Sequence, residues 1–285
     1  MPKRVSNRAH WLCACIALAL ATFACNIPIS EEPPPATLAP PTMQAILPTS
    51  EPLPPPAATP EPDVSFEGIS FSFDALITDQ VIPEFIPAQQ DPDLPEWEHV
   101  SNHYEFHFQG YVLAETFHDP RIIIYPIADL IAQFEYTADT VAALQQLLAN
   151  RPAIPDDHLP FLPSFNAAQL FRTQAAFVDF QNGSGIRYLT QYGQAASPIN
   201  SHELFYTFQG ISADNQYYVA AILPVAHPSL PADGSQVPGG DWAAFSEGFM
   251  QYALDMQGQL QSQDPSSFNP SLLLLDSMIQ TILTE

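Results

Sequence analysis

The sequence is poor in positive charge. Three of its seven Lys and Arg residues precede residue 25, so the remainder has four arginines, no lysine and all 31 acidic residues. Removing residues 1–24 therefore changes the formal net charge from −24 to about −27. Such a body cannot displace counterions from a phosphate backbone, which excludes nucleic acid as a partner. The missing lysine also excludes Walker-type phosphate binding and Schiff-base chemistry, because both need its amine. The four arginines are Arg121, Arg151, Arg172 and Arg187.

Cysteine is almost as scarce and is confined to one end. The chain has three cysteines, Cys13, Cys15 and Cys25, and all of them lie in the first 25 residues. The rest of the chain therefore has no disulfide, no thiol nucleophile and no thiolate zinc site. Nothing in the sequence indicates a cofactor.

Residues 1–24 have the pattern of an export signal. Three cations precede an apolar run of about 14 residues, WLCACIALALATFA, and a small residue ends it. At ~1.5 Å per residue such a run spans ~21 Å as a helix, which is short of the ~30 Å hydrocarbon core of a bilayer. The run therefore indicates a signal rather than a membrane-spanning helix.

The sequence Ala24-Cys25 before a polar, Pro-rich stretch resembles the lipobox of bacterial lipoproteins. This resemblance implies that the signal is removed before Cys25 and that Cys25 then carries acyl chains such as palmitate. Thr22 and Phe23 depart from the Leu and the small residue usual at those positions. The alternative is an ordinary signal followed by an incidental cysteine.

Residues 25–63 are predicted to form a tether. Thirteen prolines fall between Asn26 and Asp63, and the segment has little periodic apolar pattern. Because proline fixes φ and has no N–H, we expect this stretch to be disordered, extended and solvated. The expected organisation is a signal peptide over 1–24, a lipidated Pro-rich tether over 25–63 and a single globular domain over 64–285.

The first half of the globular domain combines strand and helix patterns. Prolines over 80–95 predict a long loop without regular structure, and the apolar run RIIIY at 121–125 predicts a strand buried on both faces. The other predicted elements are a strand region over 64–73 with a bulge at Gly68, a strand over 103–113 and a helical region over 127–150.

Two hairpins follow. The first joins 175–181 to 186–192 through a turn at 182–185, and the second joins 204–211 to 216–223 through a four-residue loop. In the second, we expect Phe208 to face Val219. Both faces carry apolar residues, which predicts that helices cover the sheet on both sides. Helices over 241–261 and 272–283 are the expected covering elements.

This order of elements predicts an α+β fold, a mainly antiparallel sheet covered by helices. The order over roughly 64–260 resembles the PsbP-like fold of photosystem accessory proteins and related exported domains. The plan of the whole chain is similar to that of uncharacterised exported bacterial lipoproteins, which implies a location and no activity.

The first candidate site is a histidine-rich strand. His103, Glu105 and His107 project from one face if this segment is a strand, while Tyr104 and Phe106 project from the other. Imidazole and carboxylate are zinc ligands, so two of the three residues with a third ligand from elsewhere form a candidate metal site. The alternative is a wet polar face opposite an aromatic core face.

The second candidate site is a polar and aromatic strand. It contains Arg187, Tyr188, Gln191 and Tyr192. An arginine among such residues predicts either a structural ion pair, for which Asp179 is the obvious partner, or an anion-binding group in a ligand site.

The sequence favours a surface-tethered, non-enzymatic binding or accessory domain. We expect it to be exported and lipid-anchored at the outer face of a bacterial cell membrane or in the cell envelope. Its expected partners are the membrane, through acylated Cys25, and an extracytoplasmic protein or small molecule. The alternatives are a metal-dependent hydrolase that uses the His103/Glu105/His107 face and a purely structural envelope component.

Overall fold

The computed structural model describes residues 61–89, 99–132, 135–153 and 159–285, which fall within a compact unit extending from Ala58 to Glu285. The predicted signal, Cys25 and all of the predicted tether before residue 61 lie outside the described residues, as does the 90–95 part of the predicted loop. No helix in the described part of the chain combines the length and the apolar character needed to cross a bilayer.

A seven-stranded antiparallel sheet forms the centre of the unit, with the strand order β3-β4-β5-β9-β8-β7-β6. Together with the helices that flank it, this sheet confirms the predicted α+β class. Its strands are β3 (Gln80–Ile86), β4 (His103–Gln109), β5 (Arg121–Pro126), β6 (Ala168–Phe180), β7 (Gly183–Gly193), β8 (Phe205–Ser212) and β9 (Tyr217–Pro224).

A second, three-stranded sheet joins the two ends of the described unit. It consists of β1 (Val64–Phe66), β2 (Ile69–Phe71) and β10 (Leu283–Thr284), in the order β1-β2-β10. The predicted bulge at Gly68 is wrong. Glu67 and Gly68 have φ of 49° and 80° and form a two-residue hairpin turn, which requires positive φ at both central positions.

The predicted loop over 80–95 is also wrong in its first half, where β3 forms. This strand pairs with β4 along its whole length, and Pro83 lies opposite Phe106. A proline removes one backbone donor, and an edge strand needs donors on one side only. The position of β3 at the edge of the sheet therefore allows a strand that contains proline.

The apolar strand β5 is buried on both faces, as predicted. Ile122 and Ile124 belong to one core cluster, whereas Ile123 and Tyr125 belong to a second cluster on the opposite face. Successive side chains of a strand point to opposite faces, so β5 stabilises both cores at once.

Both hairpins form, with turns shifted from the predicted positions. In the first, Gln181 and Asn182 make the turn, since Phe180 pairs with Gly183. In the second, Phe208 faces Ala221 rather than Val219. The β8–β9 register is thus two residues away from the prediction, and a shift of two leaves every side chain on its predicted face.

The β8–β9 turn explains the register. Ser212 Oγ accepts hydrogen bonds from the backbone N–H groups of Gln216 and Tyr217, and it donates to Asp214 Oδ1. Ser212 therefore belongs to the end of β8, and the loop begins one residue later than predicted.

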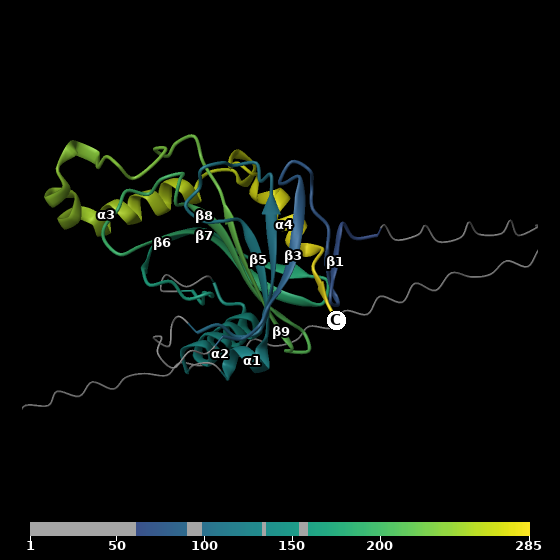
Figure 1. The fold of residues 1–285 in the computed structure, drawn as a ribbon. Coiled ribbons are helices and arrows are strands. Elements are labelled where there is room, and N and C mark those ends of the chain that lie inside the picture. The colour runs from purple at the N-terminus through teal and green to yellow at the C-terminus, as the bar shows by residue number, and fades with distance from the viewer. Residues whose placement is uncertain (1–60, 90–98, 133–134, 154–158) are drawn as a thin grey trace, which may run out of the picture. The chain divides into compact units, whose positions relative to one another are not determined.

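Helices cover both faces of the seven-stranded sheet, as predicted, but the two helices expected to cover it lie on the same face. Helices α1 (Ile127–Ile131) and α2 (Glu135–Asn150) pack on one face, and α3 (Trp242–Gln261) and α4 (Leu272–Gln280) pack on the other. In Figure 1 the first two lie together in the lower part of the view and the other two in the upper part. Asp241 begins α3 as its N-cap by accepting from the N–H groups of Ala243 and Ala244 at 2.9 and 3.2 Å.

Candidate functional site

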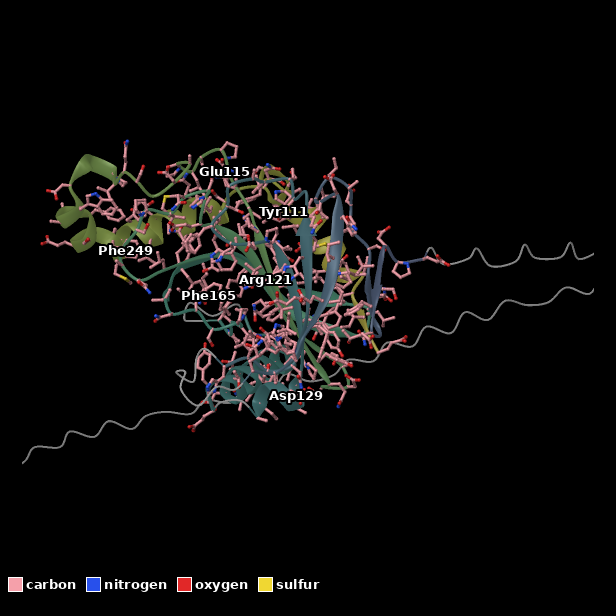
Figure 2. All side chains as sticks on the ribbon, viewed as in Figure 1. Tyr111, Glu115, Arg121, Asp129, Phe165 and Phe249 are labelled. Atoms are coloured by element: carbon pink, nitrogen blue, oxygen red, sulfur yellow. The ribbon has the colours of Figure 1, made fainter. Side chains whose placement is uncertain are left out.

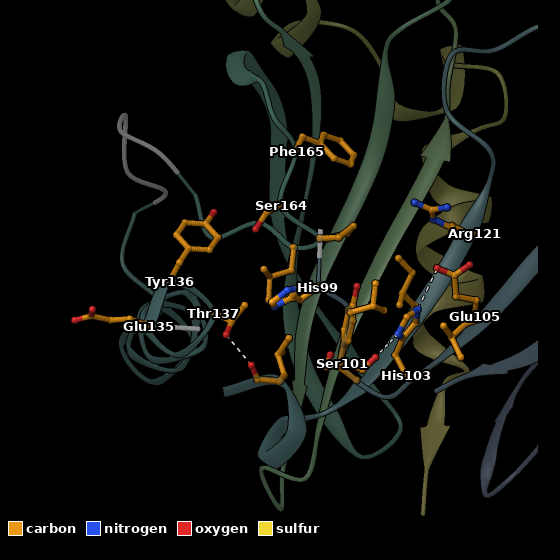
Figure 3. A pocket seen from close by; sticks show the side chains of 17 residues that line it. His99, Ser101, His103, Glu105, Arg121, Glu135, Tyr136, Thr137, Ser164 and Phe165 are labelled. Carbon is orange, nitrogen blue, oxygen red and sulfur yellow. Dashed lines mark hydrogen bonds and ion pairs between the residues drawn. The ribbon is translucent and has the colours of Figure 1, made fainter. Parts of the chain in front are cut away.

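A pocket of about 720 Å³ lies between the α1–α2 face of the sheet and helix α2 (Figure 3). Strands β3, β4 and β5 and the segment 99–101 supply one wall, while α1, α2 and the segment 162–165 supply the other. Its volume lies within the range of about 300–1,000 Å³ that is typical of small-molecule sites. We therefore treat it as the candidate functional site.

The sheet wall carries the polar groups of the pocket. His103 and Glu105 come from β4 and Arg121 from the first position of β5. Arg121 pairs across the strands with His107, which places all four residues on one face of the sheet. The predicted alternation along β4 is thus confirmed, since Phe106 points into the opposite core. The alternative of a wet face does not describe His103, which is only 5% exposed.

Glu105 lies between two imidazoles. One carboxylate oxygen is 3.3 Å from His103 Nε2 and the other is 3.1 Å from His107 Nε2. Burial raises the pKa of the Glu105 carboxyl. The His103 hydrogen bond and the charges of Arg121 and the two histidines lower this pKa, and together they outweigh burial, so the net pKa is below its ordinary value. Glu105 is therefore an ionised group whose two oxygens already have partners.

His103 is held in place by acceptors on both sides. Its Nδ1 is 2.7 Å from the carbonyl oxygen of Ser101, and its Nε2 faces Glu105. Both neighbours accept hydrogen bonds, so the ring satisfies both only when both nitrogens carry hydrogen. The ring also contacts Tyr125, at a centroid distance of 5.1 Å.

Arg121 differs from the other arginines in its surroundings. Among the described residues, its side chain makes no hydrogen bond or ion pair, and its buried Nε has no acceptor. The Ser101 hydroxyl, in the same pocket, is also buried without a hydrogen-bond partner. A buried donor without an acceptor costs free energy, so both groups are suited to contact a bound molecule.

The rest of the pocket is mainly apolar. Ile86, Ile123, Leu130, Leu162 and Phe165 all line it. Figure 2 labels Arg121 and Phe165 near the middle of the molecule, and both line the same pocket. The pocket therefore presents an apolar body with a few convergent polar groups, as ligand sites commonly do.

Phe165 is held by His118, which lies three residues before Arg121 in the sequence. The rings of His118 and Phe165 stack at 5.2 Å with an interplanar angle of 9°. Burial and, to a smaller degree, the nearby Arg121 charge together lower the pKa of His118 to about 4. His118 is therefore neutral at pH 7, and it adds no second positive charge beside Arg121.

The structure places the three predicted metal-ligating residues together but in a different arrangement. Glu105 lies between His103 and His107, with one oxygen on each ring, so the three side chains do not converge on a common point. In the part of the chain that the structure describes, no group of three or more His, Cys, Asp or Glu residues is placed to hold a metal ion.

The second candidate site lies within the sheet. Arg187, Tyr188 and Gln191 are buried, and Tyr192 is half-buried. Tyr188 donates to the carbonyl of Pro160 at 3.0 Å, and the Gln191 amide donates to the carbonyl of Pro198 at 3.1 Å. The Tyr188 hydroxyl and the Gln191 amide therefore have their hydrogen-bond partners within the fold.

Arg187 forms an ion pair, but its partner is not the predicted Asp179. Its Nε is 3.2 Å from Asp276 Oδ1, in α4, and its Nη1 donates to the carbonyl of Gln174. Asp179, named as the obvious partner, instead pairs with Arg151. The correction follows from the β6–β7 register, in which Asp179 lies opposite Ser184 and Arg187 lies opposite Ala176.

Sequence reasoning missed Arg121, Ser101 and the segment 162–165 as parts of a site. The sequence did contain an indication for Arg121, because it is one of few cations and stands at the start of an otherwise apolar strand. No comparable signal marks Ser101 or 162–165, since only the fold brings these segments to β4 and β5.

Comparison of the chain with protein-family models, with curated proteins and with solved structures found no match.

Proposed function

We propose that the protein is an exported, lipid-tethered binding domain without catalytic activity, and that the pocket beside α2 holds a small molecule. The observation that carries this proposal is the combination of a pocket of about 720 Å³, mainly apolar walls and buried polar groups that have no partner within the described chain. The signal, Cys25 and the Pro-rich tether support the location.

The metal-dependent hydrolase is less well supported. Because Glu105 separates the two histidines, it blocks rather than completes a shared metal position. The metal alternative would require both rings to rotate away from Glu105 and a third ligand to approach.

A histidine–serine contact outside the pocket also lacks the arrangement of a nucleophile and base. His227 Nδ1 accepts from the N–H of Ser229 at 3.2 Å, so its Nε2, 3.1 Å from Ser267 Oγ, is the nitrogen that carries hydrogen. The ring therefore donates to Ser267 and cannot take its proton, and no carboxylate orients it. We interpret this cluster as a hydrogen-bonded support for the loop before α3.

A neutral fluorescent probe tests the binding function. We expect phenylnaphthylamine to bind the purified full chain saturably at one site, because its rings match the apolar walls. Ser164 is exposed at the pocket wall, so Ser164→Trp should fill the entrance without disturbing the core and should abolish this fluorescence enhancement.

Ser246→Trp is the matched control, since Ser246 is exposed on α3 and does not line the pocket. Unchanged binding by Ser246→Trp with loss in Ser164→Trp supports the proposal. Equal binding by both variants, or no saturable binding by the wild type, contradicts it.

A further inference from the structure

The arginines of the globular unit show which cation is available for a ligand. Arg151 pairs with Asp179, Arg187 pairs with Asp276, and Arg172 has an interaction within the fold. Among the described residues, the guanidinium of Arg121 makes neither a hydrogen bond nor an ion pair, and its buried Nε has no acceptor. In a unit with so few cations, this one is directed into the pocket (Figure 3).

The acid nearest to Arg121 on the sheet wall is already engaged. Glu105 attracts Arg121 electrostatically, but its two oxygens contact His103 and His107. The buried Nε of Arg121 is thus left without an acceptor. An incoming carboxylate can accept from Nε and from a terminal nitrogen of the same guanidinium, which is the bidentate geometry that arginine prefers.

The walls beyond Arg121 favour an apolar group. Ile123, Leu162 and Phe165 line the pocket, and Phe165 is held by its stacking on His118. A molecule that placed its charge on Arg121 would therefore lay its remaining atoms against hydrocarbon. We propose that the pocket binds a monocarboxylate with an apolar body, with the carboxylate on Arg121 and the body against the wall of α1, α2 and 162–165.

This inference rests on the proposed function and adds the chemical class of the ligand. A dianion such as phosphate fits less well, because one guanidinium neutralises only one charge and the whole body carries a formal charge of about −27. A cation fits less well because, of the two carboxylates that line the pocket, Glu105 has its partners already and Glu135 is exposed to solvent, which screens its charge.

The test is displacement of phenylnaphthylamine from the full chain by compounds matched in length. Octanoate should displace the probe at a roughly 10- to 100-fold lower concentration than octanol or octylammonium, the range expected for a hydrogen-bonded charge pair. From hexanoate to decanoate the affinity should rise about fourfold per methylene, as burial of each CH₂ predicts. Inorganic phosphate should not displace the probe.

Two arginine variants separate the role of Arg121 from a general charge effect. Arg121→Gln should lose the preference for octanoate over octanol while still binding phenylnaphthylamine, which reports an intact pocket. Arg151→Gln removes the same charge from an exposed pair and should change octanoate affinity by less than about twofold. Arg121→Lys should restore part of the preference, because it restores the charge without the bidentate fork.

The outcomes distinguish this inference from the proposed function. If phenylnaphthylamine binds in the pocket but octanoate and octanol displace it equally, or if Arg121→Gln and Arg151→Gln behave alike, the ligand class is wrong and the binding function stands. Displacement by phosphate or octylammonium as strong as that by octanoate also overturns the ligand class. If the probe does not bind in the pocket, both proposals fail.

Discussion

At the scale of single residues, the most constrained charged group is Asp276. Its carboxylate forms an ion pair with Arg187, whose Nε is 3.2 Å from Oδ1, and accepts from the hydroxyl of Tyr206 at 2.9 Å. Burial raises the pKa of Asp276, and the Arg187 charge and the hydrogen bonds only partly offset that effect. The network joins β7 and β8 to α4, and Arg187 extends it to the carbonyl of Gln174 in β6.

Arg187→Met should destabilise the fold by about 3–5 kcal/mol at pH 7, because it leaves a buried carboxylate without its cation. The Asp276 pKa then rises further above its unfolded value, so the folded variant gains stability as pH falls and its carboxyl becomes protonated. The loss relative to the wild type should therefore shrink at acidic pH. Urea unfolding at several pH values measures both effects.

Arg151→Met is the control for that measurement. Arg151 and Asp179 form an exposed pair, with side chains 44% and 62% exposed, so their separation should cost less than about 1 kcal/mol. Equal losses in the two variants, or a loss in Arg187→Met that grows at acidic pH, would contradict the role assigned to Asp276.

At the scale of elements, local patterns predicted most of the fold and failed where one residue changes a turn. The periodicity of 121–125 and of the two hairpins fixed which faces are buried, because side-chain alternation depends on local sequence alone. The register of β8–β9 depended on whether Ser212 ends a strand or begins a loop, and its hydroxyl decides this. Strand β3 was missed because it contains Pro83, and proline is tolerated in an edge strand only. The sequence does not show which strand lies at an edge.

Alanine substitutions at Gly68, in a turn, and at Gly258, in a helix, should change the stability of the fold in opposite directions. Gly68 has φ of 80°, and a Cβ there would lie 2.8 Å from the carbonyl oxygen of Glu285. Gly68→Ala should therefore destabilise the fold by about 1–2 kcal/mol, the cost of the left-handed region for a residue with a side chain.

Gly258→Ala should have the opposite sign. Gly258 lies inside α3, and no heavy atom is within 4 Å of the position its Cβ would take. The substitution should stabilise the fold by about 0.5–1 kcal/mol, because alanine loses less backbone entropy in a helix. Thermal unfolding of both variants measures this, and a Gly68→Ala variant as stable as the wild type would show that the turn does not require glycine.

At the scale of the whole molecule, the candidate site could not be predicted because it draws on several separate segments. The pocket combines β3, β4, β5, α1 and α2 with 99–101 and 162–165. Sequence identified the histidines and Glu105 as a group, but it gave no means of placing Arg121 opposite a wall supplied by Leu162 and Phe165. Export and lipid anchoring stay a prediction, which rests on local features at the N-terminus alone.

The tether makes a prediction about location. If Cys25 carries acyl chains, each buried CH₂ contributes ~0.8 kcal/mol, and two or three chains hold the protein firmly at a membrane. Cys25→Ala should then move the full chain from the membrane fraction to the soluble fraction, whereas Cys13→Ala should not. Membrane association that persists in Cys25→Ala, with the signal shown by mass spectrometry to be removed, would rule out this anchor.

If the protein is attached through its N-terminal side, as proposed, the small sheet β1-β2-β10 has a mechanical consequence. Any pulling force transmitted along the chain from before residue 61 reaches β1 first. Val64 pairs with Phe71 at the open end of the hairpin, so tension would open the β1–β2 ladder one pair at a time. Strand β2 is also paired with β10, and β1 and β2 belong to a sheet separate from the seven-stranded one. The sheet that carries His103, Glu105 and Arg121 would therefore keep its own strand pairing while the hairpin yields, but it would lose the contacts that Phe66 and Phe71 make with Tyr104 and Phe106 on the face away from the pocket.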